Sequence, residues 1–479
     1  MERELDMMNA LNEHTGLYTD LYELTMAQGY YFAGKKDEPA AFDYFFRDNP
    51  FGGGYVIFAG LWNLLEALQN FAFSEEDIDY LRKNGFRDEF LEYLSGFSFN
   101  GTITSAAEGE VVFPVEPVLR VEGNIIECQL IETLLLNYLN FESLIATKAS
   151  RIRRMAGNRM ISDFGLRRAQ GLGGLQASRA AIIGGVDSTS NVLAGYRYNL
   201  KITGTLAHSW VQSFDDELTA FRKYAEVFPE NTVLLVDTFD TLNQGIPNAI
   251  KVGHELKEKG YQLKAIRLDS GDLAYFSKKA RKMLDDAGLQ ETKILASNQL
   301  DEYVIRSLLE QQAPIDGFGV GTELITGKNT AALDGVYKLS MNNNEPKLKI
   351  SDTYQKISLP DLKKVFRYYN GQDYFYADCI SMEDEEAPER MIHPYEMDKT
   401  CYLKGLKKEM LHQKVYEQGK ILIDEKSPLE IQVYAKERLN HLPGEHQRFE
   451  MPHIYKVGIS QKLNNVRNQL VIELRNQLK

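Results

Sequence analysis

The chain has 479 residues, more than the roughly 250–300 residues at which one hydrophobic core stops growing, so we expect at least two domains. Its hydrophobic fraction of 43% and charged fraction of 26% are typical of a soluble globular protein and exclude a disordered or fibrous chain. The net charge of −13 argues against general attraction to nucleic acid or to a membrane surface, so an anionic ligand must be held by a local basic pocket.

The cysteine content and the apolar runs predict a cytoplasmic protein. The three cysteines, Cys128, Cys379 and Cys401, form no CxxC pair, so neither a disulfide framework nor a cysteine-rich zinc site is expected. No apolar run approaches the roughly 18 residues of a membrane span. The charged N-terminus lacks the basic patch and apolar stretch of a secretory signal.

The first predicted region, residues 1–140, reads as an α+β domain. We expect a helix over residues 19–32, then a short strand in AAFDYFF and a turn at NPFGGG. Helices are expected around residues 58–70 and 75–95. Short β runs separated by Gly and Pro follow over residues 99–124.

The second region, residues 141–340, alternates apolar β-branched strands with amphipathic helices, which is typical of parallel βα units. Strand ends are read in NLKITGTLAH, NTVLLVDTFD, YQLKAIRLDSG, TKILASNQ and DGFGVGTE. Helices are predicted between them, over residues 245–259, 273–287 and 301–312. The spacing of roughly 20–35 residues between strand ends predicts a (β/α) barrel, although an open doubly wound sheet has the same periodicity.

The third region, residues 341–479, is expected to form a mixed C-terminal domain that packs partly on the N-terminal domain. GVYKLSMNNNEPKLKIS reads as a strand, a polar turn and a second strand. VFRYYNGQDYFYADCI predicts a hairpin of aromatic-rich strands with its turn at Asn370-Gly371. Charged helical patterns return in KSPLEIQVYAKERLNHL and ISQKLNNVRNQLVIELRNQL.

Polar side chains interrupt the apolar runs at the strand ends of the second region, where barrel enzymes collect their functional groups. The polar residues that follow two of these strands, in RLDSGDL and LLVDTFD, are Arg267, Asp269, Ser270 and Asp237. Asp272 and Asp240 stand in the same loops, and both are equally well explained as helix N-caps.

Two further segments have the composition of anion-binding sites. GFGVGTE places three glycines around a strand end, where bare backbone N–H groups can approach a phosphate, although a tight βα turn uses the same residues. DFGLRRAQG places the adjacent Arg167 and Arg168 in an otherwise acidic chain. Guanidinium groups bind phosphate or carboxylate oxygens, and surface ion pairs are the alternative.

His208 ends the expected strand KITGTLA. Such a histidine is either a structural hydrogen-bond partner or a functional group. The other seven histidines show no HExxH or comparable spacing, so no metal site held by a protein cage is predicted. The sequence also contains no GxSxG nucleophile elbow.

Seven segments follow one another over roughly residues 17–380: TDLYELTMAQGYY, FFRDNPFGGGY, FGLRRAQG, GGVDSTSNVLAG, GTLAHSW, RLDSGDL and GFGVGTE. In this order they resemble the nicotinate phosphoribosyltransferase family. The resemblance implies an irregular (β/α) barrel with an N-terminal α+β sandwich domain. It further implies an enzyme of NAD biosynthesis that forms nicotinate mononucleotide and diphosphate from nicotinate and 5-phosphoribosyl 1-diphosphate. ATP hydrolysis would be coupled to the reaction, with Mg²⁺ accompanying phosphoribosyl diphosphate and ATP.

The resemblance also implies roles for individual residues. His208 in GTLAHSW matches a histidine that ATP phosphorylates. The substrate pocket is implied to contain Tyr22 and Phe164 on the pyridine ring, Gly319 and Gly321 beside the 5′-phosphate, and Arg167, Thr205, Arg267, Ser270 and Thr322. Asp237 and Asp269 are implied to lie near the ribose or its metal-bound diphosphate and to stabilise the cationic centre. Family members generally form homodimers with shared active sites, and FFRDNPFGGGY is the candidate donated segment.

Three alternatives stay open. A nicotinamide-specific relative would place an acidic residue against the amide, and a quinolinate-specific relative would carry a denser basic pocket for two carboxylates. From a different class, an inactive barrel that serves as a binding module would have lost His208, Arg267 or Asp269, and the sequence retains all three.

Overall fold

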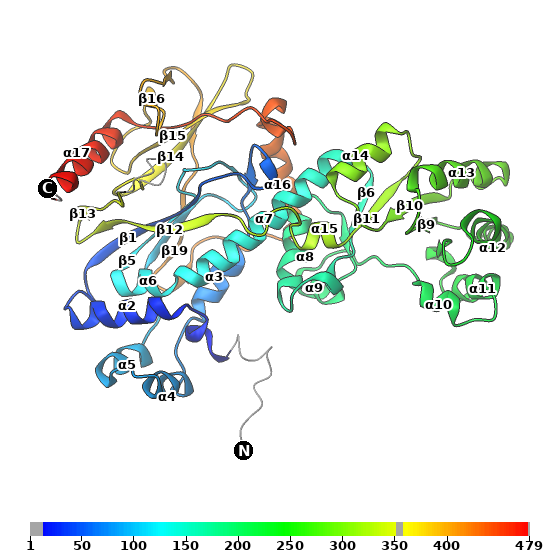
Figure 1. Ribbon diagram of the computed structural model, residues 1–479, viewed down its shortest axis with the longest axis horizontal. Helices are drawn as coiled ribbons and strands as arrows, with labels where there is room; N and C mark the ends of the chain where they lie inside the picture. The colour runs from blue at the N-terminus through cyan, green and yellow to red at the C-terminus, as the bar shows by residue number, and fades with distance from the viewer. Residues whose placement is uncertain (1–12, 351–357, 478–479) are drawn as a thin grey trace. The chain divides into compact units, whose positions relative to one another are not determined.

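The computed structural model describes residues 13–350 and 358–477 and divides the chain into two compact units (Figure 1). Unit 1 contains Met1–Thr147, Ala332–Lys426 and Glu430–Lys479, and unit 2 contains Lys148–Ala331 and Ser427–Leu429. Segments from both ends of the chain therefore share one unit, and the parallel βα segments form the other. Within the described ranges, no helix is long and apolar enough to cross a membrane.

Unit 1 is built on a seven-stranded antiparallel sheet. Its strands, in spatial order, are β13 (Glu345–Pro346), β12 (Gly335–Asn342), β1 (Pro39–Phe46), β5 (Leu119–Asn124), β3 (Thr102–Ser105), β19 (Gln413–Glu417) and β20 (Lys420–Ile421). In β1, Phe46 lies opposite Gly335 of β12, and Tyr44 lies opposite Leu119 of β5. The strand predicted in AAFDYFF is thus a central strand, and its two partners come from before and after unit 2 in the sequence.

The N-terminal helices of unit 1 bury their apolar faces in a core shared with this sheet, which contains Phe42, Leu64 and Leu91. These helices are α2 (Leu21–Phe32), α3 (Leu61–Gln69), α4 (Glu75–Lys83), α5 (Asp88–Ser95), α6 (Ile125–Leu130) and α7 (Glu132–Ala156), the last of which continues into unit 2. The helical stretch predicted over residues 75–95 divides at Gly85. Its φ of +90° is a conformation that favours glycine and that ends α4.

A second, six-stranded sheet in unit 1 is formed by the C-terminal part of the chain. Its strands, in spatial order, are β17 (Thr400–Tyr402), β16 (Arg390–Ile392), β21 (Val457–Ile459), β15 (Phe375–Met382), β14 (Lys363–Tyr369) and β18 (Lys408–Met410). The predicted hairpin is confirmed as β14 and β15, but its turn is wider than Asn370-Gly371. The Asn370 side chain accepts the backbone N–H groups of Gln372 and Tyr374, and Asp373 is the left-handed residue, with φ of +64°.

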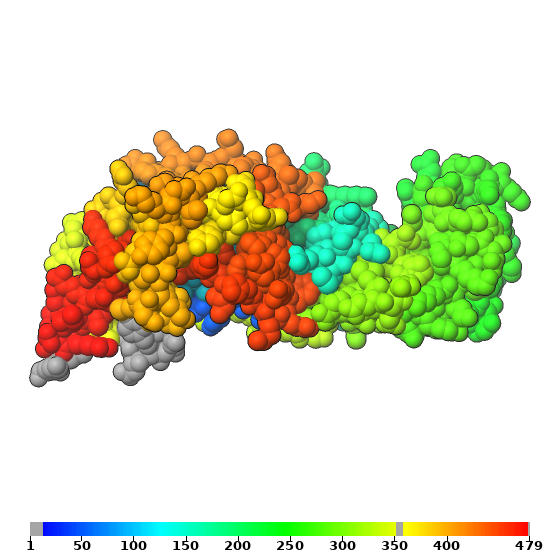
Figure 2. Space-filling view, turned by 90° about the horizontal axis from the view of Figure 1, so that it is seen from above, coloured from blue at the N-terminus to red at the C-terminus, as the bar shows by residue number. Residues whose placement is uncertain are grey.

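The two predicted C-terminal helices are confirmed as α16 (Pro428–His441) and α17 (Gln461–Gln477). Helix α17 packs on β15 and β16. Figure 2 shows that residues after about 340, coloured yellow to red, form most of the visible surface of unit 1 on this face. They cover most of the N-terminal segments from view.

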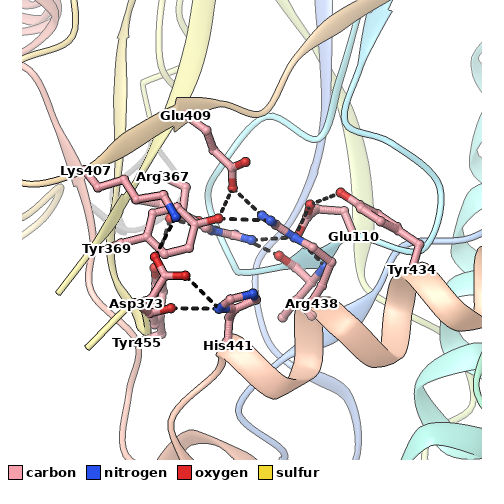
Figure 3. Close-up of polar contacts among 12 residues, drawn as sticks. Glu110, Arg367, Tyr369, Asp373, Lys407, Glu409, Tyr434, Arg438, His441 and Tyr455 are labelled. Atoms are coloured by element: carbon pink, nitrogen blue, oxygen red, sulfur yellow. Dashed lines mark hydrogen bonds and ion pairs between the residues drawn. The ribbon is translucent and has the colours of Figure 1, made fainter. Parts of the chain in front are cut away.

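A buried network of charged side chains joins β14, β15 and α16 to the segment before β4 (Val111–Val112) (Figure 3). Arg367 is fully buried, and its guanidinium group contacts Glu110 at 2.6 Å and Asp378 at 2.5 Å. Arg438 of α16 lies 2.8 Å from the other oxygen of Glu110 and also pairs with Glu409. Because every buried charge in this set has an opposite partner, the network fixes these elements at a tolerable desolvation cost.

Unit 2 is built on six parallel strands. Their spatial order is β7 (Ser188–Thr189), β6 (Met160–Asp163), β11 (Gly317–Val320), β10 (Lys293–Ser297), β9 (Ala265–Leu268) and β8 (Val233–Leu235). Every strand except β7 neighbours its successor in the sequence, and the first strand, β6, lies beside the last, β11. This cyclic order is that of a barrel and not of a doubly wound sheet. The described residues include no pairing between β7 and β8, so the predicted α/β barrel is irregular and open at that point.

The helices of unit 2 agree closely with the prediction. The three predicted helices correspond to α12 (Ile246–Glu258), α13 (Leu273–Asp286) and α14 (Glu302–Glu310). Aspartates cap the starts of the last two, since Asp272 accepts the N–H of Tyr275 and Asp301 accepts those of Tyr303 and Val304.

The strand predicted in NLKITGTLAH is wrong. Asn199 has φ of +51° and ends α9 (Val192–Tyr198), and Ile202 makes only an isolated bridge with Thr189. The Ile202 side chain instead packs on Gly195, where a Cβ atom would lie 2.3 Å from it. His208 therefore does not end a strand. It begins the short helix α10 (His208–Gln212).

Candidate active site at the strand ends of unit 2

The loops after β8 and β9 are tied together by Asp237. Its Oδ2 atom accepts the backbone N–H of Asp269 at 2.7 Å and the hydroxyl of Ser270 at 2.7 Å. The Asp237 side chain is 1% exposed, and its Oδ1 atom has no hydrogen-bond partner in the part of the chain that the structure describes. A buried carboxylate oxygen without a partner costs free energy, so this atom is well suited to a ligand that supplies a cation or a donor.

His208 faces the same pair of loops. Its Nε2 atom lies 3.9 Å from Asp237 Oδ1 and 3.9 Å from Asp269 Oδ2, while Nδ1 lies 3.1 Å from the hydroxyl of Thr238. The side chain is 39% exposed. One ring nitrogen is thus held by a hydroxyl, and the other points toward two carboxylates from a position that a ligand can reach.

Arg267, in β9, places a guanidinium group beside these residues. Its Nη2 atom lies 3.4 Å from the carbonyl oxygen of Leu206, and its Nε atom is buried without a hydrogen-bond partner among the described residues. Burial lowers the pKa of Arg267, and Asp269 and Asp237 oppose that effect. Because a guanidinium group keeps its charge in proteins, the unused donor favours binding of an anion.

Phe164 directly follows β6, and its ring centroid lies 6.0 Å from the Cζ atom of Arg267. Its backbone N–H donates to Val320 at 2.7 Å. The ring packs on Gly319 of β11, where a Cβ atom would lie only 2.4 Å from it. The strand glycine therefore makes room for an aromatic ring, which is a sufficient reason for this residue type at this position.

We expect Gly319→Ala to lower the free energy of unfolding of unit 2 by about 1–3 kcal/mol, because the added methyl group overpacks the Phe164 ring. Urea unfolding measures this through Trp210, the tryptophan of unit 2, in a Trp62→Phe background. Gly204→Ala is the matched control, since a Cβ atom there meets no atom within 4 Å. Equal stability of the two alanine variants would contradict the close packing.

The remaining predicted residues are placed as follows. Arg167 and Arg168 are exposed in the 3₁₀ turn Leu166–Arg168, and neither makes an ion pair within the described ranges. Thr205 is half-buried, and its hydroxyl donates to the carbonyl oxygen of Leu206 at 3.2 Å. Thr322 follows Gly321 and begins the four-residue helix α15 (Thr322–Ile325).

Tyr22 belongs to unit 1, at the start of α2, and its side chain is 46% exposed. Partial burial and the nearby carboxylates Glu132 and Glu23 raise the pKa of Tyr22. The segment FFRDNPFGGGY also belongs to unit 1. Its role, and that of Tyr22, stay predictions from the resemblance.

Asp240 and Asp272 are N-caps, which confirms the structural alternative for both. Asp240 accepts the N–H of Asn243 at 3.0 Å, and Asp272 accepts that of Tyr275 at 3.0 Å. Two residues of the site were not predicted from the sequence: Thr238, which contacts His208, and Ser297, whose hydroxyl donates to Asp269. The position of each at the end of β8 or β10 was the available signal.

The arrangement does not amount to a protein-built metal cage. Across the described parts of the chain, no group of three or more His, Cys, Asp or Glu side chains is placed to hold a metal ion. The site instead combines an exposed imidazole, two neighbouring carboxylates, a half-buried guanidinium group and an aromatic ring. It is thus equipped to bind a flat anion and to stabilise positive charge beside it.

Three family models match the chain. They are the nicotinate phosphoribosyltransferase N-terminal domain over residues 17–140, the nicotinate phosphoribosyltransferase family over residues 160–381, and the nicotinate phosphoribosyltransferase C-terminal domain over residues 362–467. Together they span most of the sequence.

Individual relatives agree with these matches. The nicotinate phosphoribosyltransferase of Bacillus subtilis is 42% identical, over 98% of this chain and 97% of its own. That of Caenorhabditis elegans is 37% identical, over 93% of this chain and 92% of its own. The crystal structure of human nicotinic acid phosphoribosyltransferase superposes with a TM-score of 0.86 at 31% identity, covering 94% of this chain and 99% of the human one.

Proposed function

This chain belongs to the nicotinate phosphoribosyltransferase family, and we propose that it joins nicotinate to 5-phosphoribosyl 1-diphosphate to form nicotinate mononucleotide and diphosphate in NAD biosynthesis. The observation that carries this proposal is the half-buried Arg267, whose Nε atom has no partner among the described residues and which lies beside the Phe164 ring. A flat aromatic carboxylate satisfies both groups at once. Its carboxylate takes the guanidinium donors, and its pyridine ring packs near Phe164.

The reacting centre is assigned to the carboxylates of the same site. The pyridine nitrogen forms a bond to the anomeric carbon, and the bond from that carbon to the diphosphate oxygen breaks. Positive charge develops on the ribosyl group during this exchange, and Asp237 and Asp269 are placed to stabilise it. Ser270, bonded to Asp237, holds the loop in position.

Mg²⁺ would enter this site with the substrate. Carboxylate oxygens are preferred Mg²⁺ ligands, and the unpartnered Asp237 Oδ1 and the neighbouring Asp269 fit an ion that brings its remaining ligands from diphosphate and water. When bound, Mg²⁺ supplies charge neutralisation for the departing diphosphate. We assign the 5′-phosphate to the backbone around Gly319, Gly321 and Thr322, and a further phosphate contact to Arg167.

We assign the coupling to ATP to His208. A nitrogen of its imidazole attacks the γ-phosphorus of ATP, the bond to the β-phosphate oxygen breaks, and ADP leaves. The exposed position of the ring and the bond from Thr238 to its other nitrogen support this role. The homodimer with shared active sites, the cytoplasmic location and the assignment of Tyr22 and Thr205 to the pyridine pocket are proposals on the family resemblance.

We expect Arg267→Gln to lower kcat/KM for nicotinate by about 10²-fold or more, because a substrate carboxylate loses a buried charged partner. Product formation from phosphoribosyl diphosphate is measured with nicotinate, nicotinamide and quinolinate. Arg222→Gln is the matched control, since Arg222 pairs with Glu255 on the surface of unit 2.

Turnover of nicotinate, nicotinamide and quinolinate distinguishes the proposed function from its three alternatives. Wild-type turnover of nicotinate alone supports the proposal. Preference for nicotinamide or for quinolinate would assign the chain to one of those specificities. Binding of the substrates without turnover of any of them would identify an inactive binding module.

A further inference from the structure

A buried carboxylate lies directly beneath the turn that carries Phe164. Asp163, the last residue of β6, is fully buried. Its Oδ1 atom accepts the backbone N–H of Gly165 at 2.8 Å, and its Oδ2 atom accepts the hydroxyls of Ser178 at 2.8 Å and Thr189 at 2.7 Å. All three neighbours donate, as an ionised carboxylate requires.

Two backbone hydrogen bonds hold the peptide groups on the two sides of Phe164, and Asp163 accepts one of them. The N–H of Phe164 is bound to Val320, and the N–H of the next residue, Gly165, is bound to the Asp163 carboxylate. A Cβ atom on Gly165 would lie 2.5 Å from Ile325, so the turn is also closely packed from outside. The direction in which the Phe164 ring leaves the strand is therefore fixed by two backbone hydrogen bonds, one of which Asp163 provides.

The other two donors tie this turn to the segment after β7. Thr189 Oγ1 accepts the N–H of Asn191, and the Asn191 side chain donates to Ser178 at 3.2 Å. Asn191 is also the N-cap of α9. The carboxylate thus connects the end of β6, helix α8 (Gly173–Ile183) and the start of α9 in one buried network.

We infer that Asp163 is a positioning residue for the pyridine substrate, acting through Phe164, and that Thr189 holds its carboxylate in place. This inference rests on the proposed function, because Phe164 is assigned there to the pyridine ring. The bond from the Gly165 N–H is the link through which Asp163 acts on the position of the ring. Burial raises the pKa of Asp163, and its three hydrogen bonds oppose that effect, so the network favours the ionised form.

The first test is Asp163→Asn, which replaces one acceptor oxygen by an amide that faces a donor. We expect KM for nicotinate to rise about tenfold or more. Glu302→Gln is the matched control, because Glu302 is equally buried in unit 2 but pairs with Lys148 and Arg151 and not with the peptide group of Gly165. An equal rise in KM in both variants would overturn the proposal.

A double-mutant cycle asks whether Asp163 acts through Phe164. In a Phe164→Leu background, Asp163→Asn should raise KM for nicotinate far less than it does in the wild-type chain. Fully additive effects would overturn the proposal while leaving the proposed function intact. Absence of nicotinate turnover in the wild-type chain would instead remove the proposed function on which it rests.

Two conservative substitutions of Thr189 test the proposal even if the Asp163→Asn variant does not fold. Thr189→Val removes one hydroxyl at nearly constant volume, and Thr189→Ser restores it. We expect the valine variant to raise KM for nicotinate about threefold and the serine variant to match the wild type. The same KM in both variants would overturn the role of Thr189 and the proposal that the Asp163 network positions Phe164.

Discussion

His208→Ala is expected to abolish ATP hydrolysis while leaving a slow, ATP-independent synthesis of nicotinate mononucleotide. The substitution removes the proposed phosphoryl acceptor, but it leaves Arg267, Phe164 and the carboxylates of Asp237 and Asp269 in place. The enzyme should therefore still bind nicotinate. Incubation with γ-labelled ATP checks the first part, since the wild-type chain should acquire an acid-labile label that the variant does not.

The control for this experiment is His254→Ala. His254 is exposed on α12 of the same unit, so its loss should change neither labelling nor turnover. Thr238→Val provides an intermediate case, because it removes the hydroxyl bonded to His208 Nδ1 and should slow labelling without preventing it. Equal labelling of the wild type and the His208 variant would refute the phosphohistidine role.

Arg367→Met is expected to lower the free energy of unfolding of unit 1 by about 3–5 kcal/mol. The methionine has a similar length, but it leaves Glu110 and Asp378 buried without their shared cation. The chain has two tryptophans, Trp62 in unit 1 and Trp210 in unit 2. Urea unfolding of a Trp210→Phe background therefore reports on unit 1 through Trp62 alone.

Arg390→Met is the matched control for the network. Arg390 lies in β16 of the same sheet but is exposed, and its loss should change the free energy of unfolding by less than about 0.5 kcal/mol. A loss below about 1 kcal/mol for Arg367→Met would show that the buried network contributes little. Replacing Arg367 and Asp378 together by apolar residues should restore part of the stability, because no unpaired charge then remains between them.

Much of unit 2 could be predicted from local pattern. The apolar β-branched runs identify β8, β9, β10 and β11, and aspartates at their ends cap the helices that follow. Because the strands are parallel, their carboxyl ends meet at one edge of the sheet. The sequence alone therefore predicts that Arg267, Asp237 and Asp269 lie close together. The resemblance added Phe164 to this group and gave His208, already a candidate, its expected role.

The features of the fold that the sequence did not predict correctly have physical causes. KITGTLA alternates as a strand does, but its isoleucine packs on Gly195 and its backbone makes only an isolated bridge with Thr189. Strands β6 and β7 are too short to give a periodic signal. Arg367 is a charged residue in β14, and its burial depends on the carboxylates of Asp378 in β15 and of Glu110, which is distant in the sequence.

The pairing of β1 with β12 has a consequence for how the chain is made. Synthesis proceeds from the N-terminus, so β1 leaves the ribosome long before Gly335, the residue opposite Phe46, has been translated. The main segment of unit 2, Lys148–Ala331, has been translated by then, whereas β1 in unit 1 still lacks its partner β12 and presents an open strand edge. The segment that contains β12 therefore covers this edge of β1 only late in synthesis.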